Sequence, residues 1–307
     1  MASTANPPSE NPTAHSHLRL GVDLGGTKIA AEVLGDYGRV VEERRLPNPG
    51  NYADVLVAVR DLCDGLVDRS VAIGMGIPGS ISPTTGLVRN CNSTFINGRD
   101  FSADLAQATG RQVRVANDAN CFALSEAFDG AAAASPSVFG VIIGTGVGGG
   151  LVIGGELVHG AGGVAGEWGH IPLPWAEDGE RKAQRCWCGQ RDCMELWASG
   201  PALETDYGEG VRAPEIIDRA RAGQAAAEAA LDRYVSRLGR GLAVICNLFD
   251  PHAIVLGGGM SNVDELYERL PAAMKPYLFT DKPANKIVRN KHGDASGVRG
   301  AAWLWPR

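Results

Sequence analysis

The sequence lacks any apolar run that approaches the roughly 20 residues needed to span a membrane. It also lacks an excess of basic residues: the net charge is -6 and the isoelectric point is about 5.6, which argues against a surface for nucleic acid or anionic membranes. Residues 1–17 are largely polar and have no apolar stretch of the kind found in signal peptides. We therefore expect a disordered tail over residues 1–17 and a cytoplasmic protein whose partners are neither nucleic acid nor a membrane.

The cysteines fall into two groups. The total of seven is odd, and four are scattered along the chain, which indicates a reducing cytosol rather than a disulfide framework. The other three follow a histidine, in the order His170, Cys186, Cys188 and Cys193. Three thiols and one imidazole match a closed, structural zinc site with no position for water. The alternative is a loop of reduced, buried cysteines, but residues 181–185 (RKAQR) are too polar to become ordered without such a clip.

Residues 113–130 form an apolar strand that leads through an Asn-Asp pair directly into a helix. Asp118 is therefore expected at a helix N-terminus, where the partial positive charge stabilises a carboxylate. It should stay ionised at neutral pH and be able to accept a proton, as a general base does. The alternative is a helix cap, a role that Asn117 or Asp118 would fill equally well.

Two glycine-rich turns, each between two strands, are candidates for phosphate binding. They are Gly25-Gly26-Thr27-Lys28, between strands 18–23 and 29–34, and Gly144-Thr145-Gly146-Val147-Gly148-Gly149-Gly150, between strands 138–143 and 151–153. Such turns leave backbone N–H groups pointing outward with no side chain in the way, which suits phosphate oxygens. Either turn could instead be a tight hairpin without a ligand.

Two better-known phosphate motifs do not fit these turns. Residues 144–149 have the glycine spacing of a dinucleotide-binding loop, but that loop leads into a helix, whereas here a strand follows. Residues 21–28 resemble a P-loop, but the threonine precedes the lysine, out of the required frame, and again a strand follows. A nicotinamide-dependent dehydrogenase and a P-loop enzyme are therefore both disfavoured.

The order of the expected elements repeats along the chain. In the first half, three strands (18–23, 29–34 and 40–46) precede a helix with Val55, Val59, Leu62 and Leu66 on one face, and a strand over 71–75 follows. In the second half, two strands and the cysteine-rich insertion precede a long helix and a strand over 253–256. The apolar face of that helix is Leu231, Val235, Leu238, Leu242, Ile245 and Phe249. The 307 residues suffice for two α/β domains, with a nucleotide expected in the cleft between them.

Six motifs follow one another along the chain: Asp23-x-Gly-Gly-Thr-Lys28, Asn117-Asp-Ala-Asn120, Gly144-Thr-Gly146, Gly166-Glu-x-Gly-His170, the Cys186-x-Cys188 cluster and Gly257-Gly-Gly259. In this combination the chain resembles the ROK family of bacterial sugar kinases from Leu18 to its C-terminus. The resemblance implies an actin-like, hexokinase-like (ribonuclease H-like) α/β fold, with two domains around a cleft for ATP and sugar. The expected domains are residues 18–117 with the C-terminal helix 293–307, and residues 118–292 with the zinc loop 166–195.

The resemblance also implies roles for individual residues. Asp118 would be the base that takes the proton of the sugar hydroxyl, and Asp23 would orient Mg²⁺ through water. The sugar would contact Gly79, Asn92, Asn117, Asp118, Glu167, His170 and Glu195. The nucleotide would contact Asp23, Gly25, Gly26, Thr27, Lys28, Gly144, Thr145, Gly146, Gly257, Gly258 and Gly259.

The expected zinc ligands are His170, Cys186, Cys188 and Cys193. Since zinc takes one ring nitrogen of the histidine, the other nitrogen could face the sugar. One residue departs from the family pattern: Asp192 precedes the last cysteine, where the family usually has glycine, so that this turn is expected to differ.

The substrate implied by the resemblance is less sharply defined. Segments 79–86, 92–98, 166–175 and 292–305 look most like fructokinases, also called manno(fructo)kinases, while 117–126 looks equally like N-acetylglucosamine kinases. Trp168 and Trp175 would crowd an acetamido group at the 2-position, so fructose, and more weakly mannose, is expected to be phosphorylated on its 6-hydroxyl. The alternative is an N-acetylglucosamine kinase or a glucokinase of the same family. A homodimer is expected.

Two interpretations without kinase activity are weaker. A repressor of this family carries an N-terminal winged helix, for which residues 1–17 are too short. A non-catalytic sugar-binding module would require neither Asp118 nor the two phosphate turns, yet the chain retains all three.

Overall fold

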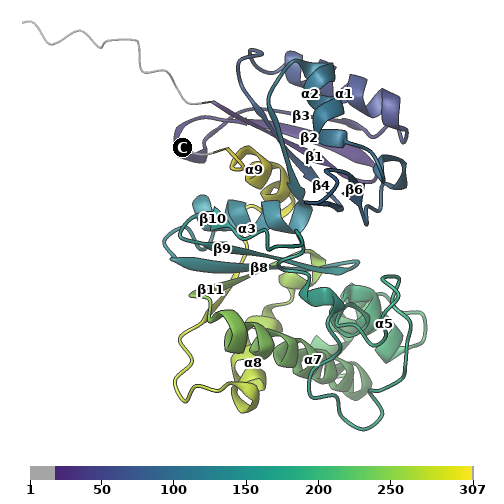
Figure 1. Cartoon of the computed structure of the whole chain (residues 1–307). Helices are drawn as coiled ribbons and strands as arrows, with labels where there is room; N and C mark the ends of the chain where they lie inside the picture. Colours follow the sequence, from purple (N-terminus) through teal and green to yellow (C-terminus); the bar gives the residue numbers. More distant parts are fainter. Residues whose placement is uncertain (1–17, 306–307) are drawn as a thin grey trace, which may run out of the picture.

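The computed structural model describes residues 18–305, so the tail expected over residues 1–17 and the last two residues lie outside it. The chain forms two five-stranded sheets stacked one above the other, with helices between them and on both outer faces (Figure 1). Within residues 18–305, no helix is both long and apolar enough to cross a membrane.

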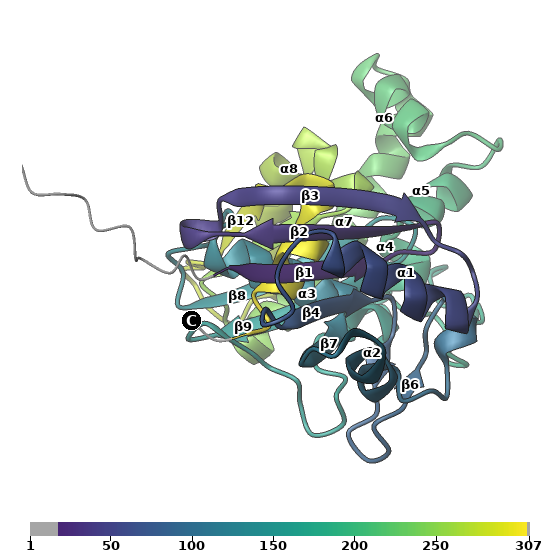
Figure 2. The same ribbon diagram turned by 90° about the horizontal axis from the view of Figure 1, so that it is seen from above.

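The first sheet has three antiparallel strands extended by two parallel ones. Their order across the sheet is β3 (Val40–Pro47), β2 (Lys28–Leu34), β1 (Arg19–Leu24), β4 (Ile73–Ile77) and β7 (Val113–Asn117). The β1–β2 and β2–β3 pairs are antiparallel, whereas β1–β4 and β4–β7 are parallel (Figure 2). Strands β1, β2 and β4 are buried along most of their length, as strands covered on both faces should be.

The second sheet repeats this arrangement strand for strand. Its order is β10 (Glu156–Leu157), β9 (Val147–Ile153), β8 (Ser137–Ile143), β11 (Ala253–Gly257) and β12 (Lys286–Arg289). The first three strands are again antiparallel, and β8–β11 and β11–β12 are again parallel. The repeat of elements predicted from the sequence is therefore present in the topology.

Helices on the outer faces complete two of the cores. Helices α1 (Tyr52–Asp64) and α2 (Phe101–Thr109) cover the first sheet, and α7 (Ala225–Phe249) and α8 (Asp264–Met274) cover the second. The predicted apolar face of α1 is buried at Val55, Val59 and Leu62, whereas Leu66 lies beyond the end of the helix and packs against the same core. Asn51 caps α1 by accepting a hydrogen bond from Asp54 N.

Two short helices lie between the sheets, α3 (Asp118–Phe128) on the second sheet and α9 (Ser296–Ala302) on the first (Figure 1). They pack against each other so closely that a Cβ on Gly300 would overlap with Cys121 O. A Cβ on Gly74 of β4 would overlap with Ala301 O in the same way. Glycine is therefore required here by the close approach of backbones.

One sequence expectation is corrected by this packing. Gly148, Gly149 and Gly150 were expected in a turn, but they lie inside β9, and the turn is confined to residues 144–146. A Cβ on Gly149 would lie 2.7 Å from the Trp168 ring, and one on Gly150 would lie 2.8 Å from Ala119 O. Without side chains at these positions, α3 and Trp168 can pack closely against the sheet. The preference of glycine for turns does not predict this packing.

Each half also carries an insertion. The first has the hairpin β5 (Ser80–Ile81) and β6 (Val88–Arg89) between β4 and α2. The second has the loop from Val158 onward and the helices α4 (Glu195–Ala198), α5 (Gly200–Tyr207) and α6 (Ala213–Arg221) between β10 and α7. These insertions supply most of the side chains of the candidate site.

Candidate active site

The junction of β7 and α3 brings an amide and a carboxylate to the start of a helix. Asn117 is the N-cap: its Oδ1 accepts from Ala119 N at 2.9 Å, and its Nδ2 donates to Gly79 O at 3.2 Å. Asp118 is the first helical residue, and its Oδ1 also accepts from Ala119 N, at 2.7 Å. Because Asn117 performs the capping, the cap interpretation of Asp118 is not needed to explain its place in the sequence.

The acidity of Asp118 differs in direction from the sequence expectation. Desolvation, followed by the nearby charge of Asp23, raises the pKa of Asp118 to about 6, and the hydrogen bond from Ala119 N only partly opposes this. We expected the helix N-terminus to set the pKa of Asp118, but desolvation has the larger effect. At pH 7 the group is still mostly ionised, and a pKa near the working pH is favourable for a general base.

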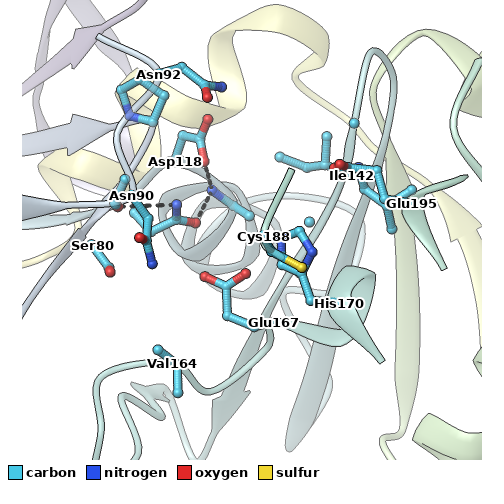
Figure 3. Close-up of a pocket in the computed structure, with 18 of the residues that line it drawn as sticks. Ser80, Asn90, Asn92, Asp118, Ile142, Val164, Glu167, His170, Cys188 and Glu195 are labelled. Carbon is cyan, nitrogen blue, oxygen red and sulfur yellow. Dashed lines mark hydrogen bonds between the residues drawn. The ribbon is translucent and has the colours of Figure 1, made fainter. Parts of the chain in front are cut away.

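Asp118 lines a cavity with a volume of about 530 Å³, shown in Figure 3. All seven residues predicted to contact a sugar line this cavity: Gly79, Asn92, Asn117, Asp118, Glu167, His170 and Glu195. Several further lining residues were not predicted from the sequence, namely Ser80, Asn90, Val164, Trp187 and Gln190. Nothing in their spacing distinguishes them from ordinary loop residues, because only the packing of the two insertions brings them together.

Two further carboxylates and an imidazole face the same space. Glu195 begins α4, and its Oε2 accepts from Val147 N at 3.1 Å while its Oε1 accepts from the Trp187 indole at 2.7 Å. Burial raises the pKa of Glu167, an effect that His170 opposes and Glu195 reinforces. Several acceptors and amides converging on one cavity can each pair with a hydroxyl, which is the arrangement a polyol needs.

The tryptophans expected to crowd the sugar lie elsewhere. Trp168 is only 3% exposed; its indole donates to Gly148 O at 2.9 Å and its ring meets Phe139 edge-on, with ring centroids 6.5 Å apart. Trp175 packs against Tyr277, with centroids 4.9 Å apart, and is not a wall of the cavity. The steric premise for fructose is therefore wrong, since Trp168 faces the core and the half-exposed Trp175 lies outside the cavity.

The four predicted metal ligands come together. One ligand atom from each of His170, Cys186, Cys188 and Cys193 lies within 4.8 Å of all the others. Cys188 and Cys193 Sγ are 3.7 Å apart, and Cys186 Sγ is 3.7 Å from His170 Nδ1. Around tetrahedral zinc, thiolate sulfurs lie about 3.8 Å apart, so the donor set has the chemistry and the spacing for that ion. Because Nδ1 faces the thiols, the other ring nitrogen is the one that can serve the cavity.

Asp192, the residue that departs from the family pattern, keeps the turn that glycine would make. Its φ is 54°, in the left-handed region that favours glycine but that aspartate tolerates. Its carboxylate accepts from Ala183 N at 3.1 Å and from Gln184 N at 2.9 Å. Aspartate at this position therefore adds two hydrogen bonds to the polar stretch before the cysteines, residues 181–185.

A buried ion cluster also orders the loop between His170 and the cysteines. Both Glu180 oxygens accept from Arg240 at 2.8 Å, and Oε1 accepts from Arg237 at the same distance. Burial alone would raise the pKa of Glu180, but the hydrogen bonds from the two arginines hold it at about 2. Arg240 also donates to Trp175 O at 2.7 Å. A metal is thus not the only group that can order this polar loop, contrary to the expectation, because Arg237 and Arg240 of α7 also hold it.

A second cavity, with a volume of about 700 Å³, shares Thr145 with the first. Of the residues predicted to bind a nucleotide, Gly144, Thr145 and Gly259 line it, and Gly146 lines the first cavity. Residues that the sequence analysis missed complete it, mainly Gly200, Pro201, Glu204, Arg212, Ile217, Met260 and Asn262. Gly200, Pro201 and Glu204 lie on α5 and Ile217 lies on α6, and neither helix carries a recognisable phosphate or base motif.

The remaining predicted nucleotide residues lie outside both cavities. Gly26, Thr27 and Lys28 are exposed at the tip of the β1–β2 hairpin, where Gly25 N donates to Lys28 O at 3.0 Å. Gly257 and Gly258 face Phe122 and Ile143 instead. Asp23 is also outside the cavity walls, but it acts electrostatically on Asp118, and desolvation raises its own pKa to about 6.

Comparisons with known proteins agree with this geometry. The profile of the ROK family matches residues 19–307. The N-acetyl-D-glucosamine kinase of Pectobacterium atrosepticum is 41% identical over 301 residues, covering 94% of this chain and 98% of that protein. The N-acetyl-D-glucosamine kinase of Vibrio cholerae is 40% identical over 299 residues, covering 94% and 99%.

Solved structures point the same way. A ROK hexokinase from Thermus thermophilus matches with a TM-score of 0.81 and 33% identity, over 93% of this chain and 97% of that chain. A ROK family glucokinase from Streptomyces griseus, solved with glucose and AMPPNP, matches with a TM-score of 0.75 and 30% identity, over 94% and 98%. The predicted hexokinase-like fold is therefore confirmed. The chain belongs to the ROK family.

Proposed function

We propose that this protein transfers the γ-phosphoryl group of ATP to a hydroxyl of N-acetylglucosamine. The kinases of this specificity described above share about two fifths of their residues with this chain over nearly its whole length. The glucokinase solved with glucose and AMPPNP is a second relative that holds a sugar and a nucleotide analogue together. Fructose, which the sequence favoured, becomes the second candidate.

One observation carries the proposal: Asp118 lines a cavity rich in carboxylates and amides, and Thr145 lines both this cavity and a second one. A sugar in the first cavity and a nucleotide in the second would bring a hydroxyl and the terminal phosphate together at the shared wall. Phosphoryl transfer needs alignment, charge neutralisation and a base more than covalent chemistry. Asp118, with its pKa raised to about 6, is the group we assign to accept the hydroxyl proton.

The other residues take the roles expected of them in this scheme. Asn92, Asn117, Glu167, His170 and Glu195 would orient the sugar, and Gly79 would let it approach the backbone. Gly144, Thr145 and Gly259 would contact the nucleotide, with the β1–β2 turn, residues 25–28, reaching its phosphates as the halves close on the sugar.

Mg²⁺ would be held near Asp23 and Asp118. The negative charge of Asp23 raises the pKa of Asp118, and a divalent cation between the two carboxylates would relieve this repulsion. When bound with ATP, the ion neutralises charge on the phosphates. We likewise assign a structural zinc to His170 and the three cysteines.

Two features of the cavity support N-acetylglucosamine as the sugar. Trp168 faces the core, so its ring does not occupy the cavity that would hold an acetamido group. Ser80, Asn90 and Gln190 add donors and acceptors to the walls, and an acetamido group requires such partners.

The larger arrangement is also part of the proposal. Residues 18–117 with the C-terminal helix, and residues 118–292, would act as two domains that close around the cleft, in a homodimer. All seven cysteines are free in the structure, which suits a cytoplasmic enzyme.

An ATP-consumption assay over N-acetylglucosamine, N-acetylmannosamine, glucose, mannose and fructose tests the function. The highest kcat/KM is expected for N-acetylglucosamine. A highest kcat/KM for fructose would show that fructose, our first expectation, is the substrate. A lack of turnover with every sugar of the panel would contradict the kinase assignment.

A further inference from the structure

Trp187 is an exposed tryptophan in the wall of the sugar cavity. Its residue surface is 63% exposed, which is unusual for the largest apolar side chain, yet the side chain is not loose. Its indole Nε1 donates to Glu195 Oε1 at 2.7 Å, and its ring meets His170 edge-on, with centroids 5.0 Å apart and planes at 87°. A large aromatic surface kept in water beside polar groups is typical of a binding site.

The loop imposes this exposure. Trp187 stands between Cys186 and Cys188, in a turn closed by hydrogen bonds from Gly189 N to Cys186 O at 3.0 Å and from Cys186 N to Gln190 O at 2.9 Å. Cys186 is buried, and the thiols on both sides of Trp187 converge with His170. With its neighbours directed inward to the thiol cluster, the tryptophan cannot move into the core without breaking that cluster.

The contact with Glu195 fixes the direction of a carboxylate that faces the sugar. Trp187 Nε1 holds one oxygen and Val147 N holds the other, at 3.1 Å. Each carboxylate oxygen has a further lone pair, so Glu195 can still accept from a sugar hydroxyl. A side chain locked in this way is pre-organised for its ligand.

We propose that Trp187 is a specificity-determining residue of the sugar site, which rests on the proposed function. Its ring provides an apolar wall for the C–H face of the bound hexose, and its indole N–H positions Glu195 for the hydroxyls. The loop that carries the thiols thereby contributes directly to sugar recognition, in addition to its structural role.

Two variants separate the ring from the N–H group. W187A removes both, and the sugar KM should rise about ten-fold while the KM for ATP stays unchanged. W187F keeps an aromatic ring without the N–H group, and a rise of about three-fold is expected. Tryptophan emission should change when sugar is added to the wild-type protein without ATP, and this change should disappear in W187F.

The matched control is W175F, at a half-exposed tryptophan that packs on Tyr277 outside the cavity. It should keep the sugar KM and the emission change. Metal content and melting temperature are measured for each variant, and if W187A loses either, the decision rests on W187F, which preserves most of the volume.

A wild-type sugar KM in both W187A and W187F, or an emission change that survives in W187F, would overturn the proposal. These outcomes require a wild-type protein that phosphorylates a sugar. If the wild-type protein phosphorylates none, the proposed function fails instead, so the two failures are distinguishable.

Discussion

The two halves of the chain share one sheet topology but differ in what they insert into it. In the first half, β3 (Val40–Pro47) is followed almost at once by α1 (Tyr52–Asp64). In the second half, the equivalent strand β10 is reduced to Glu156–Leu157, and residues 158–224 intervene before α7. This long insertion carries Glu167, Glu195, the thiol cluster and much of the second cavity.

The difference shows how two halves with the same sheet topology, the shared frame, come to have different functional parts. The two glycine turns occupy equivalent hairpins, β1–β2 and β8–β9. The first is exposed at its tip, whereas Thr145 of the second lies in the walls of both cavities. The common frame therefore provides the positions of the turns, and the insertion on the second half decides which turn is enclosed.

The largest effect is expected at Asp118, where β7 of the first half leads into α3 on the second sheet. Asp118→Asn should lower kcat by roughly 10²- to 10⁴-fold, because it removes the proposed base while preserving size and most hydrogen bonding. Sugar affinity, measured by calorimetry, should be retained. A turnover close to wild type would leave Asp118 with no more than a structural role in α3.

The insertion is tested by removing its thiols. Cys186→Ser combined with Cys193→Ser should abolish zinc binding, lower the melting temperature, and weaken sugar binding by roughly 10- to 100-fold. Nucleotide affinity should change much less. Elemental analysis should find close to one zinc per chain in the wild-type protein, and Cys246→Ala, outside the cluster, is the control. An unchanged melting temperature and sugar affinity in the double variant would show that the Glu180 cluster suffices to hold the loop.

The shared frame is tested through its close backbone contacts. Gly74→Ala would drive a Cβ into Ala301 O, and Gly140→Ala would bring one to 2.7 Å from Ala123 Cβ. Both should lower the free energy of unfolding by about 1–3 kcal/mol, with Gly74→Ala the more severe because a backbone carbonyl cannot turn away. Gly26→Ala, with no atom within 4 Å of the new Cβ, should change it by less than about 0.5 kcal/mol. Urea denaturation measures all three, and equal stabilities would contradict the account of the packing.

The smallest expected effect concerns pH. The pKa of Asp118 is raised to about 6 in the folded protein, above the ordinary aspartate value near 3.9. The folded state therefore binds the proton more tightly, so stability is greatest below pH 4 for this group and falls as pH rises through about 6. Asp118→Asn should melt a few degrees above the wild-type protein at pH 8 and lose this advantage at pH 4. An identical difference at both pH values would contradict the raised pKa.

The sequence predicted the frame well because its signals are local. Apolar strands, the Asn117–Asp118 start of α3 and the face of α1 all follow from short-range patterns, and the structure has each of them. The predicted sugar residues also gather in one cavity. These residues belong to motifs that identify the ROK family only in combination, since none of the motifs is specific by itself.

What the sequence could not supply depends on distant contacts. The side chain of Trp168 points to Phe139 and Gly148 in the core, which its position after Glu167 does not reveal. The pKa of Asp118 depends on desolvation and on Asp23, from another strand. Much of the wall of the second cavity comes from α5 and α6, helices whose sequences carry no ligand motif.

A competition reaction tests the central claim most directly. Equal concentrations of N-acetylglucosamine and fructose are supplied with limiting ATP and Mg²⁺, and the phosphorylated products are identified by mass. The account predicts that N-acetylglucosamine phosphate is the main product and that Asp118→Asn forms neither product at a comparable rate. A main product of fructose phosphate would contradict the substrate assignment, and undiminished product formation by Asp118→Asn would contradict the assigned base.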